Sequence, residues 1–211
     1  MLVSTLLTQL KNYDDIIFDL DNTLFSQCDY DNGAFEDIEN TLTDLTQIPL
    51  VGLAKFLSQR KNKMGNNYGF LFNDALTHYL LSIDYLPIVL NKYYQHNGHY
   101  ITPTNSLLPY INEEFPNKRI FIITNGPTKV QQTKIEKLSL NLHAADIIIC
   151  DPKNTDTLKP NRYAYDILNK KHKLTNPVMV GDSLETDGLF AKNVSIPFIH
   201  FTYDVSTDEN S

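Results

Sequence analysis

Four short polar clusters carry the residues whose types and spacing could support chemistry. The first is Asp19-Leu20-Asp21-Asn22-Thr23, which directly follows a run of apolar residues. Two carboxylates two positions apart point the same way at a strand end, unless the chain turns between them, and they repel each other unless a cation or proton intervenes. This spacing suits a nucleophile beside a proton donor. The ordinary alternative is a turn and helix cap made by Asp21, Asn22 and Thr23.

The second and third clusters are Thr124-Asn125-Gly126 and Lys159-Pro160. A hydroxyl, an amide and the backbone N–H of a glycine at the start of a helix offer hydrogen-bond donors to an anion. Lys159 adds a positive charge just before another helical stretch. Taken alone, the first is also typical of turns and the second of a solvated lysine before a helix.

The fourth cluster is the segment Gly181 to Asp187, GDSLETD, which contains the carboxylates of Asp182 and Asp187. Hard oxygen ligands from several strand ends suit an octahedral Mg²⁺, which keeps several waters and needs two or three protein ligands. Helix capping by Asp182 or Ser183 is the alternative. Because the four clusters occur together, each at the end of an apolar run, we favour one shared site over four unrelated turns.

Five apolar runs must position these clusters. They are almost continuous in β-branched and aromatic residues, which is typical of strands buried on both faces, and helical stretches at 129–140 and 163–170 lie between them. The alternation predicts an α/β fold with a Rossmann-like, doubly wound parallel sheet in a three-layer α/β/α arrangement. Ligands of such sheets bind at the carboxyl ends of the strands. The runs are Asp15–Leu20, Arg119–Thr124, Asp146–Cys150, Pro177–Gly181 and Pro197–Phe201.

The interval between the first and second runs is much longer than the dozen or so residues that a crossover needs. Helix-like patterns cover 34–44 and 71–94 within it. We therefore predict a helical insert over residues 25–102, lying over the carboxyl ends of the strands. The α/β core is then discontinuous and consists of residues 1–24 and 103–211.

Composition restricts the partners. The chain carries 18 basic and 25 acidic side chains, a net charge of −7, which disfavours binding to duplex nucleic acid but leaves a small phosphorylated metabolite open. Cys28 and Cys150 are far apart and lack metal-ligand spacing, so we expect both to be reduced. A signal-peptide pattern and an apolar run long enough for a membrane span are absent, so we expect a cytoplasmic protein with no membrane partner. The sequence predicts no particular oligomeric state.

Taken together, DLDNT, TNG, KP and GDSLETD resemble the four signature motifs of the haloacid dehalogenase (HAD) superfamily, in order and in approximate spacing, across almost the whole chain. The insert is similar to the helical cap domain of that superfamily. Two stretches, 123–132 and 150–160, look like pyrimidine 5′-nucleotidases. The resemblance implies an enzyme, a Mg²⁺-dependent phosphatase that hydrolyses a small phosphomonoester, such as a pyrimidine nucleoside 5′-monophosphate, through an aspartyl-phosphate.

The resemblance also implies roles for individual residues. Asp19 is the nucleophile, and Asp21 first protonates the leaving group and then activates water. Mg²⁺ is held by Asp19, the backbone carbonyl of Asp21 and Asp182, and Asp187 coordinates it directly or through water. Lys159 is both catalytic and phosphate-binding. The phosphate-binding set is Thr124, Asn125, Gly126 and Lys159.

Several functions within the superfamily stay open. A sugar-phosphate phosphatase, a phosphomutase and a non-catalytic metabolite-binding member are each compatible with these motifs. A haloacid dehalogenase is less favoured, because it has no leaving alkoxide to protonate and its family pattern lacks an aspartate at position 21. In the insert, Tyr68 is a candidate for substrate specificity, although aromatic residues at helical spacing more often form a core. His96 and His99 show no paired metal spacing and are interpreted as surface or core histidines.

Overall fold

The structure is a computed structural model that describes residues 2–65, 68–103 and 106–203. The chain divides into two compact units: unit 1 is Met1–Gln27 with Thr102–Ser211, and unit 2 is Cys28–Ile101. Within the described ranges, every helix is too short or too polar to cross a membrane.

Unit 1 is built on a five-stranded sheet in the order β3-β2-β1-β4-β5, and all neighbouring strands are parallel. Every residue of the central strand β1 is buried, as its apolar sequence predicts. The predicted parallel sheet is therefore confirmed, with small shifts at the strand ends. The strands are β1 Asp15–Phe18, β2 Arg119–Asn125, β3 Asp146–Cys150, β4 Pro177–Gly181 and β5 Phe198–His200.

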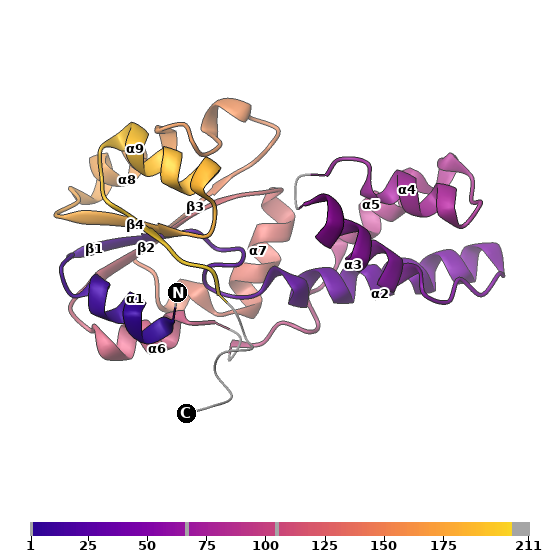
Figure 1. The fold of residues 1–211 in the computed structure, drawn as a ribbon, viewed down its shortest axis with the longest axis horizontal. Coiled ribbons are helices and arrows are strands. Elements are labelled where there is room, and N and C mark those ends of the chain that lie inside the picture. Colours follow the sequence, from indigo (N-terminus) through magenta and orange to yellow (C-terminus); the bar gives the residue numbers. More distant parts are fainter. Residues whose placement is uncertain (1, 66–67, 104–105, 204–211) are drawn as a thin grey trace. The chain divides into compact units, whose positions relative to one another are not determined.

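Helices cover both faces of the sheet and make the three layers (Figure 1). Because side chains alternate along a strand, Ile17, Phe121 and Met179 face one side, where they pack against buried residues of α8 and α9. Helices α1, α6 and α7 lie on the other side (Figure 1). The helices of unit 1 are α1 Val3–Leu10, α6 Leu108–Glu114, α7 Thr128–Lys137, α8 Tyr163–His172 and α9 Leu189–Val194, with 3₁₀ turns η3 Leu140–Leu142 and η4 Thr155–Thr157.

The sheet register brings the polar clusters to one edge. Phe18 pairs with Ile122 of β2 and with Val180 of β4, so the carboxyl ends of these three strands are in register. The backbone N–H of Asp19 then donates to the carbonyl of Val180 at 2.9 Å, which extends the pairing by one residue. Because all strands are parallel, the segments that follow β1, β2 and β4 emerge at the carboxyl edge.

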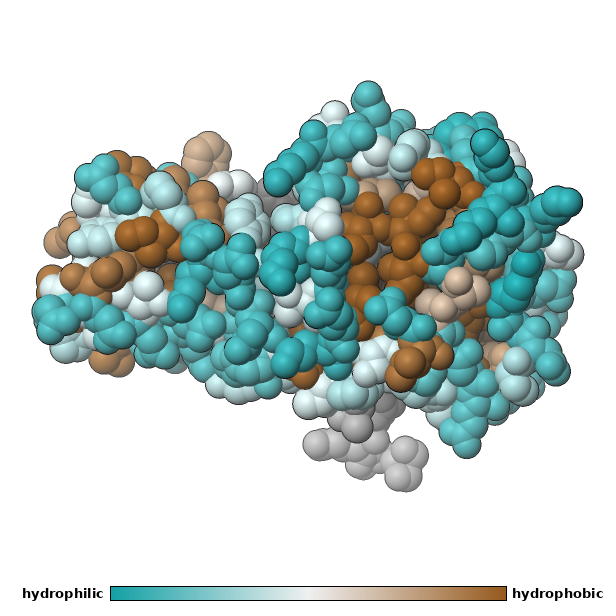
Figure 2. Space-filling model, turned by 180° about the vertical axis from the view of Figure 1, so that it is seen from behind, coloured by the Kyte–Doolittle hydropathy of each residue, from teal (hydrophilic) through white to brown (hydrophobic). Residues whose placement is uncertain are grey.

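The surface of unit 1 is not uniformly polar. Strand β3 lies at an edge of the sheet, and its residues 146–149 are only half buried. Figure 2 shows hydrophobic residues gathered on one face of unit 1.

Unit 2 is helical and has a core of its own. Buried residues of its four longest helices within the described ranges, among them Phe35, Leu57, Leu76 and Val89, form one cluster. The helices are α2 Gln27–Thr46, α3 Leu53–Met64, α4 Leu71–His78 and α5 Leu86–Gln95, with a 3₁₀ turn η1 Ile83–Tyr85 before α5.

The helix-like pattern over 71–94 is wrong as a prediction of one helix, because the chain breaks between α4 and α5. Leu80 adopts the left-handed region with φ of 55°, and the N–H of Leu81 donates back to the carbonyl of Leu76 at 2.8 Å. Pro87 then stands in the first turn of α5. The apolar spacing continues through the break because α4 and α5 bury residues in the same core.

Candidate active site

The predicted nucleophile and the predicted lysine meet at the carboxyl edge of the sheet. The Nζ of Lys159 donates to Oδ1 of Asp19 at 2.5 Å and to Oδ1 of Asp187 at 2.7 Å. All three residues are buried. The carboxylates of Asp19, Asp182 and Asp187 offer oxygens that lie within 4.8 Å of one another. One ammonium group thus contacts two of three closely spaced carboxylates.

Asn125 holds Lys159 in place through the main chain. The backbone N–H of Lys159 donates to Oδ1 of Asn125 at 2.9 Å, and Nδ2 of Asn125 donates to the carbonyl of Lys159 at 2.9 Å. The sequence predicts that the backbone of Asn125 binds phosphate, and the structure adds a second role for this residue, because its side chain holds the backbone of Lys159. Nδ2 of Asn193 adds a hydrogen bond to the carbonyl of Pro160 at 2.9 Å. These contacts fix the segment that presents the ammonium group.

Asp187 is positioned by a turn that the sequence does not predict. Residues Leu184–Gly188 form a π-helical turn, η5, which precedes α9. Ser183 caps this turn: its Oγ accepts from the N–H of Thr186 at 3.2 Å, and its own N–H donates to Oδ2 of Asp187 at 3.2 Å. A Cβ on Gly181 would lie 2.3 Å from Oδ2 of Asp187, so β4 must end in glycine.

Asp21 lies outside this carboxylate cluster and has its own partners. Asn22 takes a left-handed conformation, φ 57°, so the chain turns immediately after Asp21. Oδ1 of Asp21 is 2.6 Å from Nζ of Lys134, and its Oδ2 accepts from Nε2 of Gln131 at 3.0 Å. The predicted general acid is therefore held by two residues of helix α7.

Sequence reasoning missed both Gln131 and Lys134 as site residues. Each is 1% exposed despite being polar. The helical period carries the signal. Positions 130, 131, 134 and 135 of α7 and its C-cap, Leu138, form one stripe, and the apolar members of that stripe are buried. Polar residues within a buried stripe need partners, and here the partner is Asp21.

The predicted anion donors at the end of β2 are partly engaged within the protein. The buried hydroxyl of Thr124 accepts from Nε2 of Gln131 at 2.5 Å. The N–H of Gly126, expected to bind a phosphoryl oxygen, donates to the carbonyl of Cys150 at 3.0 Å, because it continues the pairing of β2 with β3. A Cβ at Gly126 would lie 2.9 Å from Cδ of Gln131, so this glycine makes room for the glutamine.

The electrostatics of the cluster show a shortage of positive charge. Burial raises the pKa of Asp19 to about 8; Lys159 lowers that pKa, while Asp187 and Asp21 raise it further. Burial, reinforced by Asp187, raises the pKa of Asp182 to about 6. Burial disfavours the charge on Lys159, but Asp19 and Asp187 raise the pKa of its ammonium group above the ordinary value. Carboxylates that resist ionisation in this way favour an added cation.

The donor set fits a magnesium ion. Asp19, Asp182 and Asp187 supply carboxylate oxygens within 4.8 Å of one another, and Mg²⁺ prefers oxygen ligands and one or two carboxylates together with water. A divalent cation would also neutralise the excess charge that raises the pKa values of Asp19 and Asp182.

The predicted specificity residue Tyr68 is held within unit 2. Its hydroxyl donates to Oδ2 of Asp74 at 2.8 Å, and Nε of Arg60 lies 2.6 Å from the same oxygen. The guanidinium carbon of Arg60 lies 5.5 Å from the centroid of the Tyr68 ring. The ring packs, half buried, against the helical core of unit 2.

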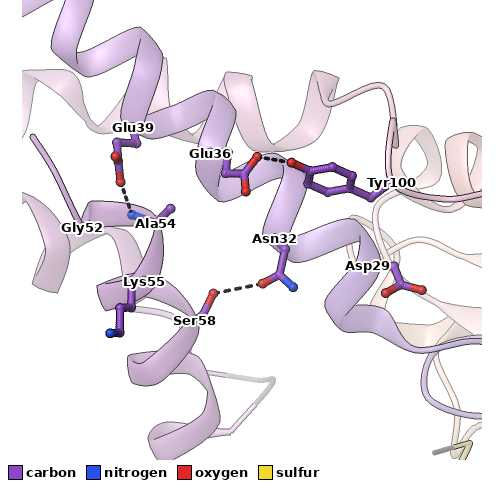
Figure 3. A pocket seen from close by; sticks show the side chains of 9 residues that line it. All are labelled: Asp29, Asn32, Glu36, Glu39, Gly52, Ala54, Lys55, Ser58 and Tyr100. Atoms are coloured by element: carbon purple, nitrogen blue, oxygen red, sulfur yellow. Dashed lines mark hydrogen bonds between the residues drawn. The ribbon is translucent and has the colours of Figure 1, made fainter. Parts of the chain in front are cut away.

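Unit 2 also contains a pocket of about 600 Å³ that sequence reasoning did not predict. Figure 3 shows residues of α2 on one side, facing α3 across the pocket. Glu36 accepts from the hydroxyl of Tyr100 at 2.5 Å, and Glu39 accepts from the N–H of Ala54 at 2.8 Å (Figure 3). The lining residues are Asp29, Asn32, Glu36, Glu39, Gly52, Ala54, Lys55, Ser58 and Tyr100.

Comparison with known proteins defines the class. Residues 16–201 match the model of the haloacid dehalogenase-like hydrolase family. Because the match covers most of the chain, this protein belongs to the haloacid dehalogenase-like hydrolases, as its motifs indicated.

Solved structures share the fold at low sequence identity. YfnB from Bacillus subtilis, assigned as a HAD-hydrolase and solved with bound magnesium, is 18% identical with a TM-score of 0.64, covering 89% of this chain and 86% of its own. A HAD phosphatase from Thermococcus onnurineus is 17% identical with a TM-score of 0.53, covering 93% and 90%. A 2-haloacid dehalogenase from Pseudomonas syringae is 16% identical with a TM-score of 0.53, covering 93% and 91%. No curated protein sequence matches the chain significantly.

Proposed function

We propose that this hydrolase is a Mg²⁺-dependent phosphatase that cleaves a small phosphomonoester through an aspartyl-phosphate on Asp19. The observation that carries the proposal is the buried contact of Lys159 with both Asp19 and Asp187, with Asp182 close by. The contact holds the carboxylate of Asp19 at the end of β1, but the cluster as a whole lacks positive charge. A bound cation would supply that charge and allow a phosphate group to approach Asp19.

In the first step, an oxygen of Asp19 attacks phosphorus and the bond from phosphorus to the ester oxygen breaks. Asp21 gives its proton to that leaving oxygen, so the product alcohol departs neutral. In the second step, water attacks the aspartyl-phosphate, Asp21 takes a proton from the water, and phosphate and free Asp19 are released. Asp21 thus ends the cycle in the protonated state in which it began.

The remaining residues bind and orient. Lys159 offsets negative charge on both the nucleophile and the phosphoryl group, while the hydroxyl of Thr124 and the backbone N–H of Asn125 supply hydrogen bonds to phosphoryl oxygens. Gln131 and Lys134 hold the carboxylate of Asp21. Asp19, Asp182, Asp187 and the backbone of Asp21 would hold Mg²⁺, which supplies charge neutralisation between a carboxylate and a phosphate dianion.

Asp21 favours a phosphatase over a dehalogenase, a distinction that the shared fold alone does not make. A halide leaves without a proton, whereas an alkoxide needs one, and Asp21 stands two residues after the nucleophile with a defined position. We therefore expect release of phosphate from p-nitrophenyl phosphate and no release of chloride from 2-chloropropionate. Chloride release outrunning phosphate release would favour the dehalogenase, and transfer of phosphate between sugar carbons outrunning its release would favour a phosphomutase.

The decisive experiment compares wild type with Asp19→Asn on p-nitrophenyl phosphate, with Mg²⁺ and with EDTA. We expect phosphate release by wild type with Mg²⁺, loss in EDTA, and loss by at least about 10³-fold in the variant. Asp14→Asn, in the same unit at the opposite end of β1, serves as the matched control. Activity that survives both metal removal and Asp19→Asn would contradict the proposal.

For the substrate, we propose a nucleoside 5′-monophosphate, with Tyr68 contributing to selection of the base. The ring of Tyr68 is half buried and its hydroxyl is tied to Asp74, so the ring is held in one orientation. Tyr68→Ala should then lower kcat/KM for UMP more than for ribose 5-phosphate, while Tyr68→Phe keeps the ring and the preference. An equal loss of kcat/KM for both substrates would show that Tyr68 does not recognise the base.

A further inference from the structure

Three side chains with metal-binding chemistry meet in unit 2, and none of them belongs to the carboxylate cluster of unit 1. Asp37 comes from α2, while His96 and His99 follow α5. Each offers one ligand atom, and these atoms lie within 4.8 Å of one another. Nδ1 of His96 is 2.8 Å from Oδ2 of Asp37, and the two imidazole centroids are 4.9 Å apart. The two histidines that sequence spacing left unpaired therefore share a site with a carboxylate.

His96 is suited to act as a ligand. The residue is 2% exposed, and its Nε2 has no hydrogen-bond partner among the described residues. A neutral imidazole is the form that binds metal ions, and a buried nitrogen without a partner needs an explanation.

Gly33 shapes the place where the two rings approach α2. It lies one helical turn before Asp37, on the same face. A Cβ at this position would lie 2.7 Å from Nε2 of His96 and 3.2 Å from Cε1 of His99. Glycine within a helix costs roughly 0.5–1 kcal/mol relative to alanine, so its presence here is accounted for by the close approach of the imidazoles.

The cluster can be reached from solvent. The side chain of Asp37 is 32% exposed and His99 is an exposed residue, whereas His96 forms the buried floor. Two ligands of a tetrahedral zinc ion, each about 2.0–2.2 Å from it, lie about 3.3 Å apart. Because the ligand atoms all lie within 4.8 Å of one another, closing the cluster around an ion requires a shift of at most about 1.5 Å, which the exposed His99 can make by side-chain rotation.

We propose that Asp37, His96 and His99 bind a divalent transition-metal ion of the zinc type in unit 2, with water completing its coordination. Two imidazoles and one carboxylate are a donor set of zinc sites that keep an open position. The all-oxygen set of unit 1 selects Mg²⁺ instead. The two clusters therefore bind different metals.

The test is a titration of the metal-stripped, full-length protein with Co²⁺ in the presence of excess Mg²⁺, which occupies the oxygen-rich site. We expect one Co²⁺ per chain with the intense visible absorption of a four-coordinate site, displaced by Zn²⁺. His99→Ala should weaken this binding at least 10-fold, and because His99 is exposed the variant should fold. His78→Ala is the control, since His78 is a histidine of unit 2 that stacks on Phe56 outside the cluster.

A second variant tests the geometry without removing a ligand. Gly33→Ala raises the helix propensity of α2 but places a methyl group against both rings, so it should keep helical circular dichroism and lose Zn²⁺ affinity at least 10-fold. Asp19→Asn should bind Zn²⁺ as wild type does, which separates this proposal from the phosphatase proposal. Equal Zn²⁺ and Co²⁺ affinity in wild type, His99→Ala and Gly33→Ala would overturn it, as would no binding to wild type.

Discussion

Both units of this hydrolase bury an aspartate–lysine ion pair, but only one of the pairs is balanced in charge. In unit 2, the ammonium group of Lys61 contacts Oδ2 of Asp31, and the hydroxyl of Tyr93 donates to Oδ1 of the same carboxylate at 2.8 Å. One positive charge meets one negative charge, and a phenol supplies a further hydrogen bond. Such a pair satisfies itself and needs nothing from outside the protein.

In unit 1, the single ammonium group of Lys159 contacts Asp19 and Asp187, and an oxygen of Asp182 lies within 4.8 Å of oxygens of both carboxylates. The excess negative charge appears as raised pKa values of Asp19 and Asp182. The comparison teaches that burial of charge does not mark a site by itself. A buried charge imbalance does mark a site, because a proton, a metal ion or a substrate has to neutralise it.

The largest expected effect follows from removing the lysine of the unbalanced cluster. Lys159→Met should lower kcat for p-nitrophenyl phosphate by about 10³-fold, because the charge developing on the phosphoryl group loses its ammonium partner. Lys61→Met, the matching change in unit 2, should leave kcat within about twofold at a temperature where it is folded. Steady-state kinetics at saturating Mg²⁺ measures both, and wild-type kcat in Lys159→Met would refute the assignment.

Removing the lysine of the balanced pair should instead affect stability. Lys61→Met should lower the free energy of unfolding by about 3–4 kcal/mol, because Asp31 keeps a buried charge without a partner. Adding Asp31→Leu should restore most of the loss. Urea unfolding measures all three proteins, and a double variant as unstable as Lys61→Met would show that the unpaired carboxylate is not the cause.

Magnesium should stabilise the unit whose charge is unbalanced. At a concentration of about 100 times its Kd, Mg²⁺ should raise the free energy of unfolding by about 2.7 kcal/mol. Asp182→Asn should lose most of this gain, whereas Lys61→Met should retain it. Thermal unfolding with Mg²⁺ or EDTA measures the difference, and an equal gain in Asp182→Asn would place the ion elsewhere.

Gly181 tests whether the position of Asp187 matters. Gly181→Ala puts a Cβ 2.3 Å from Oδ2 of Asp187, so we expect a loss of about 2 kcal/mol in stability and weaker Mg²⁺ binding. Gly69→Ala in unit 2 is the control, because nothing lies within 4 Å of its added Cβ. Urea unfolding measures the loss of stability, and calorimetry measures the affinity for Mg²⁺. Unchanged affinity in Gly181→Ala would mean that Asp187 need not be fixed.

The smallest effect concerns a carboxylate of unit 1 outside the buried cluster. Oδ2 of Asp151 accepts from the N–H and the hydroxyl of Thr128 at the start of α7. Chiefly through the hydroxyl, this lowers the pKa of Asp151 to about 2. Its contribution is therefore present above the unfolded pKa of about 3.9 and is lost as the pH falls towards about 2.

Asp151→Ala should cost about 1 kcal/mol at neutral pH, as expected for a helix cap, and the difference from wild type should shrink as the pH falls below about 4. Unfolding by urea at a series of pH values measures it. Asp166→Ala, which removes an exposed pair with Arg162, should cost less than about 0.5 kcal/mol. A loss in Asp151→Ala that does not depend on pH would show that the cap does not act through the carboxylate.

Local pattern was sufficient for the strands but not for every helix. The predicted run Arg119–Thr124, for example, is apolar on both faces through its centre, and that composition has few alternatives to a buried parallel strand. The break at Leu80 was missed, because a leucine in the left-handed region carries no sequence signal of its own. The π-helical turn at Leu184–Gly188 likewise has no sequence signal of its own. Its geometry depends on the tertiary contacts that place Asp187.

The sequence by itself determined the α/β class, the membership of the family and the identity of Asp19, Asp21, Lys159, Asp182 and Asp187 as candidates, because residue type and order along parallel strands are local information. Tertiary structure alone decided the partners. Gln131 and Lys134 reach Asp21 from α7, the side chain of Asn125 holds the backbone of Lys159, and His96 meets Asp37. These pairs join residues 34 to 113 positions apart. Contacts across such distances depend on how helices pack, and one-dimensional spacing does not contain that information.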